Sequence, residues 1–462
     1  MISLNANKIF ICIFSSLFII INLIWLFFDP FNTTTQYNYI VSYLNINIRF
    51  ALDSISFFFI YLTTLLIPLC LLFSIRSRNT PVTHYYNNDL IFSIGILLLI
   101  VFSVFDILIF YISFEAILLP FFIYIGIAGY RQRRIHASYL FFFYTIIGSF
   151  FMLISIFFLF IYSGTTYLEL LWVTEFPYLT SQLIWIALFF TFSIKVPMFP
   201  FHIWLPEAHV EAPTEGSVLL AGLLLKLGPY GMIRFLFPIF PELTYYYAPF
   251  VITLASIGII YTSFITLRQI DIKKIIAYSS IAHMNMVILG LFSFNEAGFL
   301  GSIFLMIGHG IVSGGLFFCI GIIYDRYHTK IIHYLSGIIN GMPVLSFCLF
   351  IFILGNVGLP GTSNFIGELL ILCGIAYSHL FVSLIAAAIG IFLCTIYSIY
   401  TYNKIIFLMP YKYNIYISDL YLFEYIVLLP LIFFSLYLGV FPNIVLDSLQ
   451  NVQLYNFINI FI

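Results

Sequence analysis

Six ionisable side chains lie within long apolar runs of the sequence, where a charge is costly. They are Glu115, Lys195, Lys226, His283, His309 and Glu368. Ionisable groups inside membrane segments are rare and usually belong to ion or proton pathways. Burial lowers the pKa of a lysine and raises that of a carboxylic acid, whereas a nearby opposite charge does the reverse. A set of such groups in one chain therefore predicts a proton relay, switched when oppositely charged partners move apart.

A structural role is the alternative for each of these residues. Glu115 and Lys195 would then only pair to hold two helices together, and His283 or His309 would only hydrogen-bond across helices. Asp106 lies near the end of an apolar run and is interpreted as interfacial. The number of ionisable groups in the set favours the relay over these simpler roles.

The composition explains why these charges stand out. The chain has 462 residues, of which 63% are hydrophobic and only 8% are charged, with a net charge of −1. Soluble chains carry about 25% charged residues, so a soluble globule of this size could not cover its surface. No basic surface is available for a nucleic-acid partner. We expect a polytopic membrane protein in contact with lipids.

The apolar runs predict an all-α membrane protein with about 13 transmembrane helices of about 20 residues each. The predicted spans are 8–28, 51–75, 90–104, 106–128, 137–162, 182–202, 216–239, 246–267, 272–292, 297–323, 341–377, 380–408 and 419–441. The first run lacks a small-residue cleavage site, so we expect a retained span rather than a signal peptide. Two spans look broken, one at Pro197 and Pro200 and the other at Leu359-Pro360-Gly361. Paired broken helices are typical of inverted-repeat transporters, although either one alone could be a proline kink.

The predicted loops sort by charge. Basic residues follow the even-numbered spans: Arg76, Arg78, Arg131, Arg133, Arg134, Arg268, Lys273, Lys274, Arg326, Lys330, Lys404 and Lys412. The odd-numbered junctions carry Glu169, Glu175, Glu242 and Glu296. The positive-inside rule places the basic loops, and with them the N-terminus, on the cytoplasmic side or its equivalent.

A polar segment separates two of the spans and holds two histidines and three glutamates. These residues are His202, Glu207, His209, Glu211 and Glu215. Their spacing is poor for a metal site. We interpret the segment as a polar funnel that feeds protons from the basic side, with a solvated loop as the alternative.

No cofactor or metal is expected on this chain. Its six cysteines all lie in apolar stretches without CxxC spacing, which predicts buried reduced thiols, and the sequence has no GxGxxG or P-loop pattern. Any redox or nucleotide chemistry must therefore occur in a partner.

Five motifs of the sequence are distinctive: KVPMFPFHIWLPEAHVEAP at 195–213, GSVLLAGLLLKLGPYG at 216–231, AYSSIAHM at 277–284, MIGHG at 306–310 and GLPGTSNFIGEL at 358–369. They closely resemble those of the antiporter-like subunits of respiratory complex I, NADH:ubiquinone oxidoreductase. The resemblance covers roughly residues 50–410. Sister subunits tend to carry lysine where this sequence has Glu368, which favours the chain 4 branch of the family.

The resemblance implies a proton-pumping core subunit of the membrane arm with two inverted five-helix repeats, each containing a broken helix. The family's essential glutamate falls on Glu115, its broken-helix lysine on Lys195 and its central lysine on Lys226. Its half-channel histidines fall on His283 and His309, and its second broken-helix carboxylate on Glu368. NADH, flavin, iron–sulfur clusters and ubiquinone are then expected in other subunits of the complex, with neighbouring antiporter-like subunits as the main partners.

The same resemblance implies four regions and a location. The regions are N-terminal helices at 1–89, a first repeat at 90–240, a second repeat at 241–410, and a C-terminal helix and tail at 411–462. The location is the mitochondrial inner membrane. Heavy use of Ile, Phe, Tyr and Asn suggests an AT-rich genome, so we expect a mitochondrially encoded chain.

Two departures from the family pattern remain. The family usually has 14 spans, and only one predicted span precedes Leu52-Asp53 here where two are usual. Glu215 replaces a small residue. The alternatives to a complex I subunit are a standalone cation/proton antiporter subunit, a purely structural spacer in the membrane arm, and an ordinary uniporter or sugar carrier.

Overall fold

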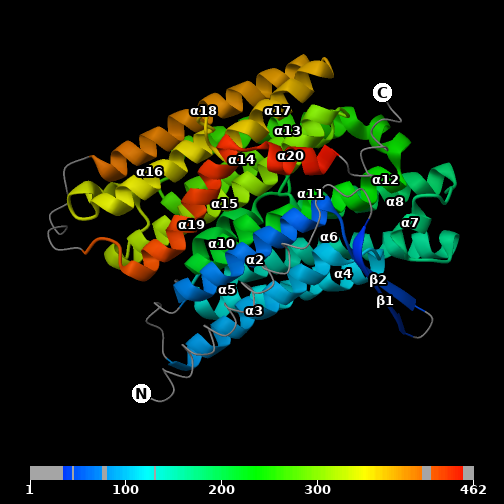
Figure 1. Cartoon of the computed structure of the whole chain (residues 1–462), viewed down its shortest axis with the longest axis horizontal. Coiled ribbons are helices and arrows are strands. Elements are labelled where there is room, and N and C mark those ends of the chain that lie inside the picture. Colours follow the sequence, from blue (N-terminus) through cyan, green and yellow to red (C-terminus); the bar gives the residue numbers. More distant parts are fainter. Residues whose placement is uncertain (1–34, 44–45, 75–80, 130–131, 408–417, 451–462) are drawn as a thin grey trace.

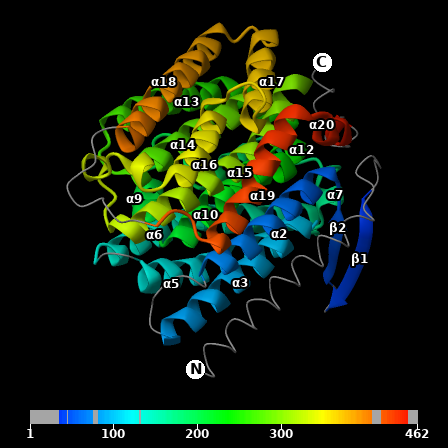
Figure 2. The same ribbon diagram turned by 60° about the vertical axis from the view of Figure 1, so that its left-hand side comes forward.

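The structure is a computed structural model that describes residues 35–43, 46–74, 81–129, 132–407 and 418–450. Long helices lie side by side in one bundle, with α2 (Ser54–Ser74) and α3 (Pro81–Ser103) on one flank and α17 (Ser363–Tyr377) and α18 (Phe381–Ile406) on the other (Figures 1 and 2). The all-α membrane fold predicted from the sequence is confirmed for the described part of the chain.

Ten helical segments in the described residues are long and apolar enough to cross a membrane. They are Ser54–Ser74, Ile107–Ala128, Arg134–Ser163, Tyr178–Lys195, Thr214–Ile239, Pro241–Arg268, Ile272–Leu291, Glu296–Tyr327, Phe381–Ile406 and Leu422–Val440. Three shorter apolar helices are Asn87–Ser103, Pro343–Val357 and Ser363–Tyr377. The predicted span 8–28 lies outside the described residues. The predicted span 341–377 corresponds to the two short helices Pro343–Val357 and Ser363–Tyr377 together, and each of the other predicted spans coincides with one of the segments above. The count of 13 is therefore not confirmed.

The named elements follow the same order along the chain. The helices not yet given bounds are α4 (Ile107–Ala116), α5 (Leu118–Ala128), α6 (Arg134–Ser163), α7 (Leu168–Leu171), α8 (Tyr178–Lys195), α9 (Trp204–Glu211), α10 (Thr214–Gly222), α11 (Leu227–Gly231), α12 (Phe237–Ile239), α13 (Pro241–Arg268), α14 (Ile272–Leu291), α15 (Glu296–Tyr327), α16 (Pro343–Val357), α19 (Leu422–Val440) and α20 (Asn443–Gln450). Short 3₁₀ turns η4 (Ile332–Tyr334) and η5 (Ile338–Asn340) connect α15 to α16.

Both predicted helix breaks are present. Helix α8 ends at Lys195, just before Pro197, and the chain becomes helical again only at Trp204. Helices α16 and α17 are separated at Gly358, whose φ of 74° is in the left-handed region that favours glycine. The breaks therefore follow from proline and glycine at the positions where the sequence places them.

Two further interruptions were not predicted, one between α4 and α5 at Ile117 and one in the span at 216–239. The span at 216–239 was expected to be one continuous helix, but it contains the 3₁₀ turn η2 (Leu224–Lys226) and the π-helical turn η3 (Met232–Leu236). Pro229 has no N–H to donate to the carbonyl four residues earlier, which weakens the α-helical ladder at this point. Such local departures from α-helical geometry are frequent at functional sites.

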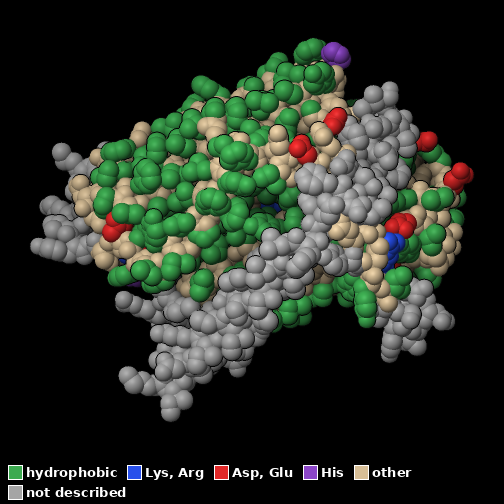
Figure 3. Space-filling model, in the orientation of Figure 1, with side chains coloured by type: hydrophobic (Ala, Val, Ile, Leu, Met, Phe, Trp, Pro, Cys, Tyr) green, Lys and Arg blue, Asp and Glu red, His purple; other side chains and the backbone are tan. Residues whose placement is uncertain are grey.

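The centre of the bundle is formed by α15 and by the segment from α10 to α12. The most apolar stretch of each is fully buried, and α15 contacts α2, α10, α14, α16, α17 and α19. Outward-facing helices instead expose large apolar side chains, such as Phe143, Phe150 and Phe157 on α6. Hydrophobic side chains dominate the face shown in Figure 3, as expected for a surface that faces lipid.

A two-stranded hairpin precedes α2 and was also not predicted. Strand β1 (Gln36–Tyr43) pairs antiparallel with β2 (Ile46–Leu52), almost entirely between the predicted spans 8–28 and 51–75, where the sequence predicted no element. Arg49 on β2 forms an ion pair with Glu169 on α7, with Nη1 3.0 Å from Oε1. This contact fixes the hairpin on the glutamate-bearing side of the bundle.

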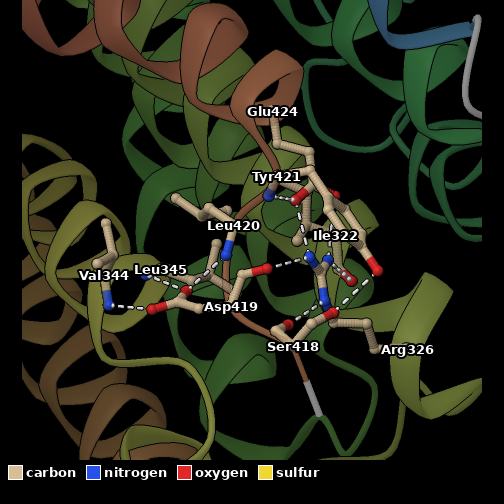
Figure 4. A network of polar contacts seen from close by, with 9 residues as sticks. All are labelled: Ile322, Arg326, Val344, Leu345, Ser418, Asp419, Leu420, Tyr421 and Glu424. Carbon is tan, nitrogen blue, oxygen red and sulfur yellow. Dashed lines mark hydrogen bonds and ion pairs between the residues drawn. The ribbon is translucent and has the colours of Figure 1, made fainter.

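Cross-contacts between loops support the predicted sidedness. Asp271 and Ile331 form a β-bridge between two even-numbered junctions, and Asp106 and Tyr167 form one between two odd-numbered junctions. On the even-numbered side, Arg326 at the end of α15 binds Glu424 at the start of α19, with Nη2 2.7 Å from Oε2 (Figure 4). Connections predicted to share a side of the membrane are therefore in contact.

The group of contacts in Figure 4 joins three helices. The Arg326 guanidinium also donates hydrogen bonds to the carbonyls of Ser418 and Asp419. The Asp419 carboxylate accepts hydrogen bonds from the N–H groups of Val344 and Leu345 at the start of α16. One arginine and one aspartate thus hold the ends of α15, α16 and α19 together.

Candidate functional site, a chain of buried ionisable groups

Glu115 lies at the bend between α4 and α5. Pro120 leaves the Ala116 carbonyl without its usual N–H donor, and the two helices are separated at Ile117. The Glu115 side chain is half-buried, and its buried Oε1 has no hydrogen-bond partner among the described residues. An unpaired buried carboxylate oxygen is unusual and favours a functional role.

Lys195 is the last residue of α8 and is buried. Its Nζ lies 4.4 Å from the centroid of the Phe114 ring, so it is next to the residue that precedes Glu115. Glu115 and Lys195 are close enough for each charge to influence the other. The two side chains nevertheless form no ion pair with each other in the described part of the chain. The predicted pair is thus close but not in direct contact.

Lys226 is fully buried at the end of η2 in the bundle centre. Its Nζ donates a hydrogen bond to the Ala221 carbonyl and lies 2.9 Å from Nδ1 of His309 on α15. The interruption of the α-helix at η2 therefore coincides with the residue that contacts the neighbouring helix. A Cβ added at Gly310, the residue after His309, would lie 3.1 Å from the Gly222 carbonyl oxygen. Glycines at these two positions therefore let the two helices come close together.

His283 on α14 links His309 to Glu368. The two imidazole rings are tilted with centroids 5.5 Å apart, and Nδ1 of His283 lies 3.4 Å from Oε1 of Glu368. On its other side, Nε2 of His283 faces Sγ of Cys394 at 3.9 Å. All three ionisable side chains are buried.

Glu368 lies against the break between α16 and α17. A Cβ added to Gly358 would be 2.5 Å from Oε2 of Glu368. Glycine at this position thus meets two requirements, since the backbone has a positive φ and the carboxylate occupies the space that a side chain would need.

The structure places the six predicted site residues in two groups. Lys226, His309, His283 and Glu368 form a connected series, whereas Glu115 and Lys195 form a separate pair. The two groups are linked through the close packing of α8 against α11. Gly228 on α11 allows this packing, because a Cβ added there would lie only 3.0 Å from the Phe192 carbonyl oxygen on α8. No direct contact between Lys195 and Lys226 occurs among the described side chains.

The polar segment after α8 is largely buried, so the solvated-loop alternative is wrong. Residues 204–211 form α9, on which His209 is fully buried and its ring is stacked against Phe317 of α15 with centroids 4.7 Å apart. Glu211 and Glu215 are also buried, whereas Glu207 is half-buried and pairs with Lys274 at 2.8 Å. The polar-funnel interpretation remains compatible with these positions.

Two buried lysines were missed as site candidates. Lys273 and Lys330 were assigned to basic loops, but both are fully buried. The sequence contained a signal for Lys273, because it shares a helical face with Ile276, Ala277 and Ser280. Lys330 lies in an irregular connection, where no periodicity could have indicated burial.

The described part of the chain shows no group of three or more His, Cys, Asp or Glu that could hold a metal ion. The described cysteines are all free thiols. Cys70, Cys319, Cys348 and Cys394 are buried. The prediction of burial is wrong for Cys373, which is exposed on α17, and Cys12 lies outside the described residues.

Comparisons with known proteins agree with this geometry. Residues 105–394 match the family described as NADH:quinone oxidoreductase/Mrp antiporter, TM. The chain is 48% identical over 433 residues to NADH-ubiquinone oxidoreductase chain 4 of Marchantia polymorpha, covering 92% of this chain and 86% of that one. It is 46% identical to the chain of the same name from Arabidopsis thaliana, with 92% and 86% covered.

Solved structures show the same fold. A chain of respiratory complex I from Thermus thermophilus with bound NADH superposes with a TM-score of 0.88 at 27% identity, covering 96% of this chain and 94% of that one. A chain of the Mrp complex from Dietzia sp. DQ12-45-1b superposes with a TM-score of 0.83 at 18% identity, covering 98% and 96%, which shows the fold alone. On the family match and the two curated relatives, this chain belongs to the antiporter-like family of membrane subunits that includes NADH-ubiquinone oxidoreductase chain 4.

Proposed function

We propose that this chain translocates protons as a membrane-arm subunit of an NADH:ubiquinone oxidoreductase, using the buried ionisable groups as its proton path. The observation that carries the proposal is the connected series Lys226, His309, His283 and Glu368 at the centre of the bundle. The 48% identity to a curated NADH-ubiquinone oxidoreductase chain 4 supports the assignment to that enzyme.

Electron transfer takes place in other subunits. This chain acts as part of the oxidoreductase without binding NADH, flavin, iron–sulfur clusters or ubiquinone itself. Its partners are the other membrane-arm subunits, above all the neighbouring antiporter-like subunits, together with lipids. The chain spans the mitochondrial inner membrane several times and is encoded in the mitochondrion.

Proton transfer along the central series uses the two nitrogens of each imidazole. A proton leaves the Lys226 ammonium for Nδ1 of His309, and the ring releases its other proton from Nε2 toward His283. His283 then passes a proton from Nδ1 to Oε1 of Glu368, which exchanges it with the glutamate-bearing side. The Lys226–His309 and His283–Glu368 steps join atoms 2.9 Å and 3.4 Å apart, whereas the step between the two histidines joins rings whose centroids are 5.5 Å apart.

The Glu115–Lys195 pair serves as the switch. Lys195 lies close to Glu115 without a direct ion pair, so a movement of α4 or α8 that changes their separation changes their attraction in inverse proportion to that separation. A charge disturbance from the redox subunits that alters this separation makes Lys195 release or take up a proton. The break after Lys195 gives the end of α8 freedom to move.

Protons reach the central series from the basic side through the polar segment on α9. His209, on α9 within the polar segment, is fully buried, and its ring is stacked on Phe317 of α15, the helix that also carries His309. The regions 90–240 and 241–410 act as two inverted five-helix repeats, each with one broken helix, flanked by residues 1–89 and 411–462.

Replacement of Glu115 by Gln, or of Lys195 by Met, tests the proposal in the assembled complex. The rate of NADH-driven proton pumping in reconstituted vesicles should fall by at least about tenfold, because a positioned proton-transfer group contributes about 10²–10⁴-fold to the rate of its step. Glu296→Gln is the matched control, since Glu296 is exposed at the start of α15, and it should pump normally. Normal pumping by a fully assembled Glu115→Gln complex would contradict the relay and leave a structural spacer.

A second candidate is a standalone cation/proton antiporter subunit. The fold shared with the Mrp complex chain favours keeping this candidate. Purification of the native assembly separates the two, because only the proposed function predicts that this chain remains bound to NADH-oxidising subunits.

A further inference from the structure

Cys394 is a buried cysteine near the middle of α18 that lies against the proposed proton path. Its Sγ is 3.9 Å from Nε2 of His283 on α14. The opposite nitrogen of the same ring, Nδ1, lies 3.4 Å from Oε1 of Glu368 on α17. The His283 ring is therefore held between a thiol and a carboxylate, and the path described above gives the thiol no part.

The thiol is fixed by Asn356, near the end of α16. Sγ of Cys394 donates a hydrogen bond to the backbone carbonyl of Asn356 at 3.4 Å and accepts one from its side-chain Nδ2 at 3.7 Å. Helix α16 ends at Val357, and Pro360, four residues after Asn356, has no N–H to donate to this carbonyl. The break between α16 and α17 thus leaves a carbonyl that receives the thiol hydrogen.

The direction of the thiol hydrogen determines where the His283 ring carries its proton. A thiol has one hydrogen to donate, and its sulfur is a weak acceptor. Because the hydrogen of Cys394 is donated to the Asn356 carbonyl, the sulfur faces Nε2 of His283 as an acceptor. An acceptor at Nε2 favours the tautomer with a proton on that nitrogen. The neutral ring then keeps a lone pair on Nδ1, on the side of Glu368.

We propose that Cys394 is a positioning residue of the proton path, which holds His283 with a proton on Nε2 and with Nδ1 toward Glu368. When the ring is charged, it carries a proton on each nitrogen. In the transfer, the N–H bond at Nδ1 breaks, its electron pair stays on Nδ1, and an O–H bond forms at Oε1 of Glu368. The proton on Nε2 stays on the ring, donated to the sulfur. The imidazolium and the carboxylate thereby both become neutral.

This inference rests on the proton path proposed above and adds one residue to it. Without the sulfur, the proton on Nε2 would have no acceptor in a site where His283, Glu368 and Asn356 are only 6%, 4% and 5% exposed. An unpaired N–H in the interior costs free energy. The ring then gains by turning away from Glu368, or by keeping its proton on Nδ1 when it is neutral. Either change lowers the fraction of molecules with a lone pair on Nδ1 facing Glu368.

A packing role for Cys394 is the alternative, because a buried cysteine behaves as a small apolar side chain. Cys348 on α16 offers a matched comparison. It is 3% exposed, against 5% for Cys394, and both lie within helices. In the described part of the chain, Cys348 forms no hydrogen bond with a residue of the proposed path. Only the positioning role therefore predicts different results when the two sulfur atoms are removed.

The test compares Cys394→Ala with Cys348→Ala in the assembled complex, reconstituted into vesicles. Each variant removes one sulfur atom from a buried helical position. The rate of NADH-driven proton pumping should fall about fivefold in Cys394→Ala, which is the net effect of one hydrogen bond on an equilibrium. Cys348→Ala should pump normally. Equal rates in the two variants would overturn the positioning role.

Two further substitutions of Cys394 separate its polarity from its volume. Cys394→Val fills the space with apolar atoms and should pump as slowly as Cys394→Ala. Cys394→Ser should restore most of the rate, because a hydroxyl also has one hydrogen to donate and lone pairs that accept. Normal pumping by Cys394→Val, or pumping by Cys394→Ser no faster than by Cys394→Val, would show that the residue acts through packing alone. These two variants decide the question if Cys394→Ala does not assemble.

His283→Gln distinguishes failure of this inference from failure of the path. Alone it should slow pumping at least about tenfold, and adding Cys394→Ala should cause no further fall, since the thiol acts through His283. A further fall of about fivefold in the double variant would mean that Cys394 acts elsewhere. Normal pumping by His283→Gln would overturn the path itself. Slow pumping by His283→Gln with normal pumping by Cys394→Ala would overturn only the positioning role.

Discussion

Nζ of Lys226 lies 2.9 Å from Nδ1 of His309, although 83 positions separate the two residues in the chain. The contact coincides with the 3₁₀ turn η2, which follows α10 and ends at Lys226. A buried ammonium next to an imidazole nitrogen can share one proton with it, and neither group has access to bulk water. In the proposed proton path, this pair begins the buried series that ends at Glu368.

Replacing Lys226 by Met should abolish pumping while leaving the fold in place. Methionine fills a similar volume without a charge, so the buried position is not destabilised by an unpaired group. We expect the rate of NADH-driven proton pumping to fall at least about tenfold, as for loss of a positioned proton-transfer group. Proton uptake into reconstituted vesicles, measured with a pH-sensitive dye, gives the result.

Lys404→Met is the matched control for that variant. Lys404 lies near the end of α18, with Nζ 4.8 Å from the Tyr400 ring centroid and far in sequence from the buried series. The same chemical change there should leave pumping normal. Equal losses in the two variants would argue against a specific role for Lys226.

Gly358→Ala should disturb Glu368 as well as the backbone. Alanine at a φ of 74° is strained by about 1–3 kcal/mol, and its Cβ would fall 2.5 Å from Oε2 of Glu368. The carboxylate must then move away from His283. We expect a lower thermal unfolding temperature of the complex together with reduced pumping per NADH.

Gly361→Ala separates these two effects. Gly361 has a φ of 94°, but a Cβ there would have nothing within 4 Å. This variant should show the backbone strain alone, with a similar loss of thermal stability and normal pumping by the molecules that assemble. If Gly361→Ala reduced pumping as much as Gly358→Ala, displacement of Glu368 would not be the cause.

Loss of the buried ion pair between Arg326 and Glu424 should destabilise the bundle strongly. The side chains are 6% and 0% exposed, and removing one partner leaves an uncompensated buried charge. For Arg326→Met we expect about 3–5 kcal/mol of lost stability. Thermal unfolding and limited proteolysis near residue 418 would report separation of α19 from α15.

Lys274→Met provides the comparison on the same side of the membrane. Lys274 pairs with Glu207 at 2.8 Å, but the side chains are 27% and 35% exposed. Such a pair contributes about 0–1 kcal/mol, so unfolding should be nearly unchanged. A comparable destabilisation in both variants would show that burial does not determine the strength of these contacts.

The sequence by itself determined the membrane architecture and the candidate residues. Hydrophobic runs predicted the spans that the structure describes, because in lipid every backbone group must be paired within a helix. Proline and glycine predicted both broken helices, since those residues change the backbone locally. Charges are so scarce that each one inside a span could be identified as a candidate without a structure.

The tertiary structure decided which of those candidates meet. Sequence order does not show that Lys226 contacts His309 or that His283 contacts Glu368, because these contacts depend on how α10, α14, α15 and α17 pack. It also does not show that Glu115 and Lys195 stay apart. The hairpin before α2 was missed for the same reason, since its Arg49 pairs with Glu169 on α7, a contact between residues 120 positions apart in the chain.

Burial was the other property that only the folded chain defined. Lys273 and Lys330 have the sequence appearance of loop lysines that mark one side of a membrane, yet the fold encloses both against backbone carbonyls. A charge at the end of a span can face water or the protein interior, and neighbouring residues in the sequence do not distinguish the two. The physical reason is that desolvation depends on every element that packs around a group, including those distant in the chain.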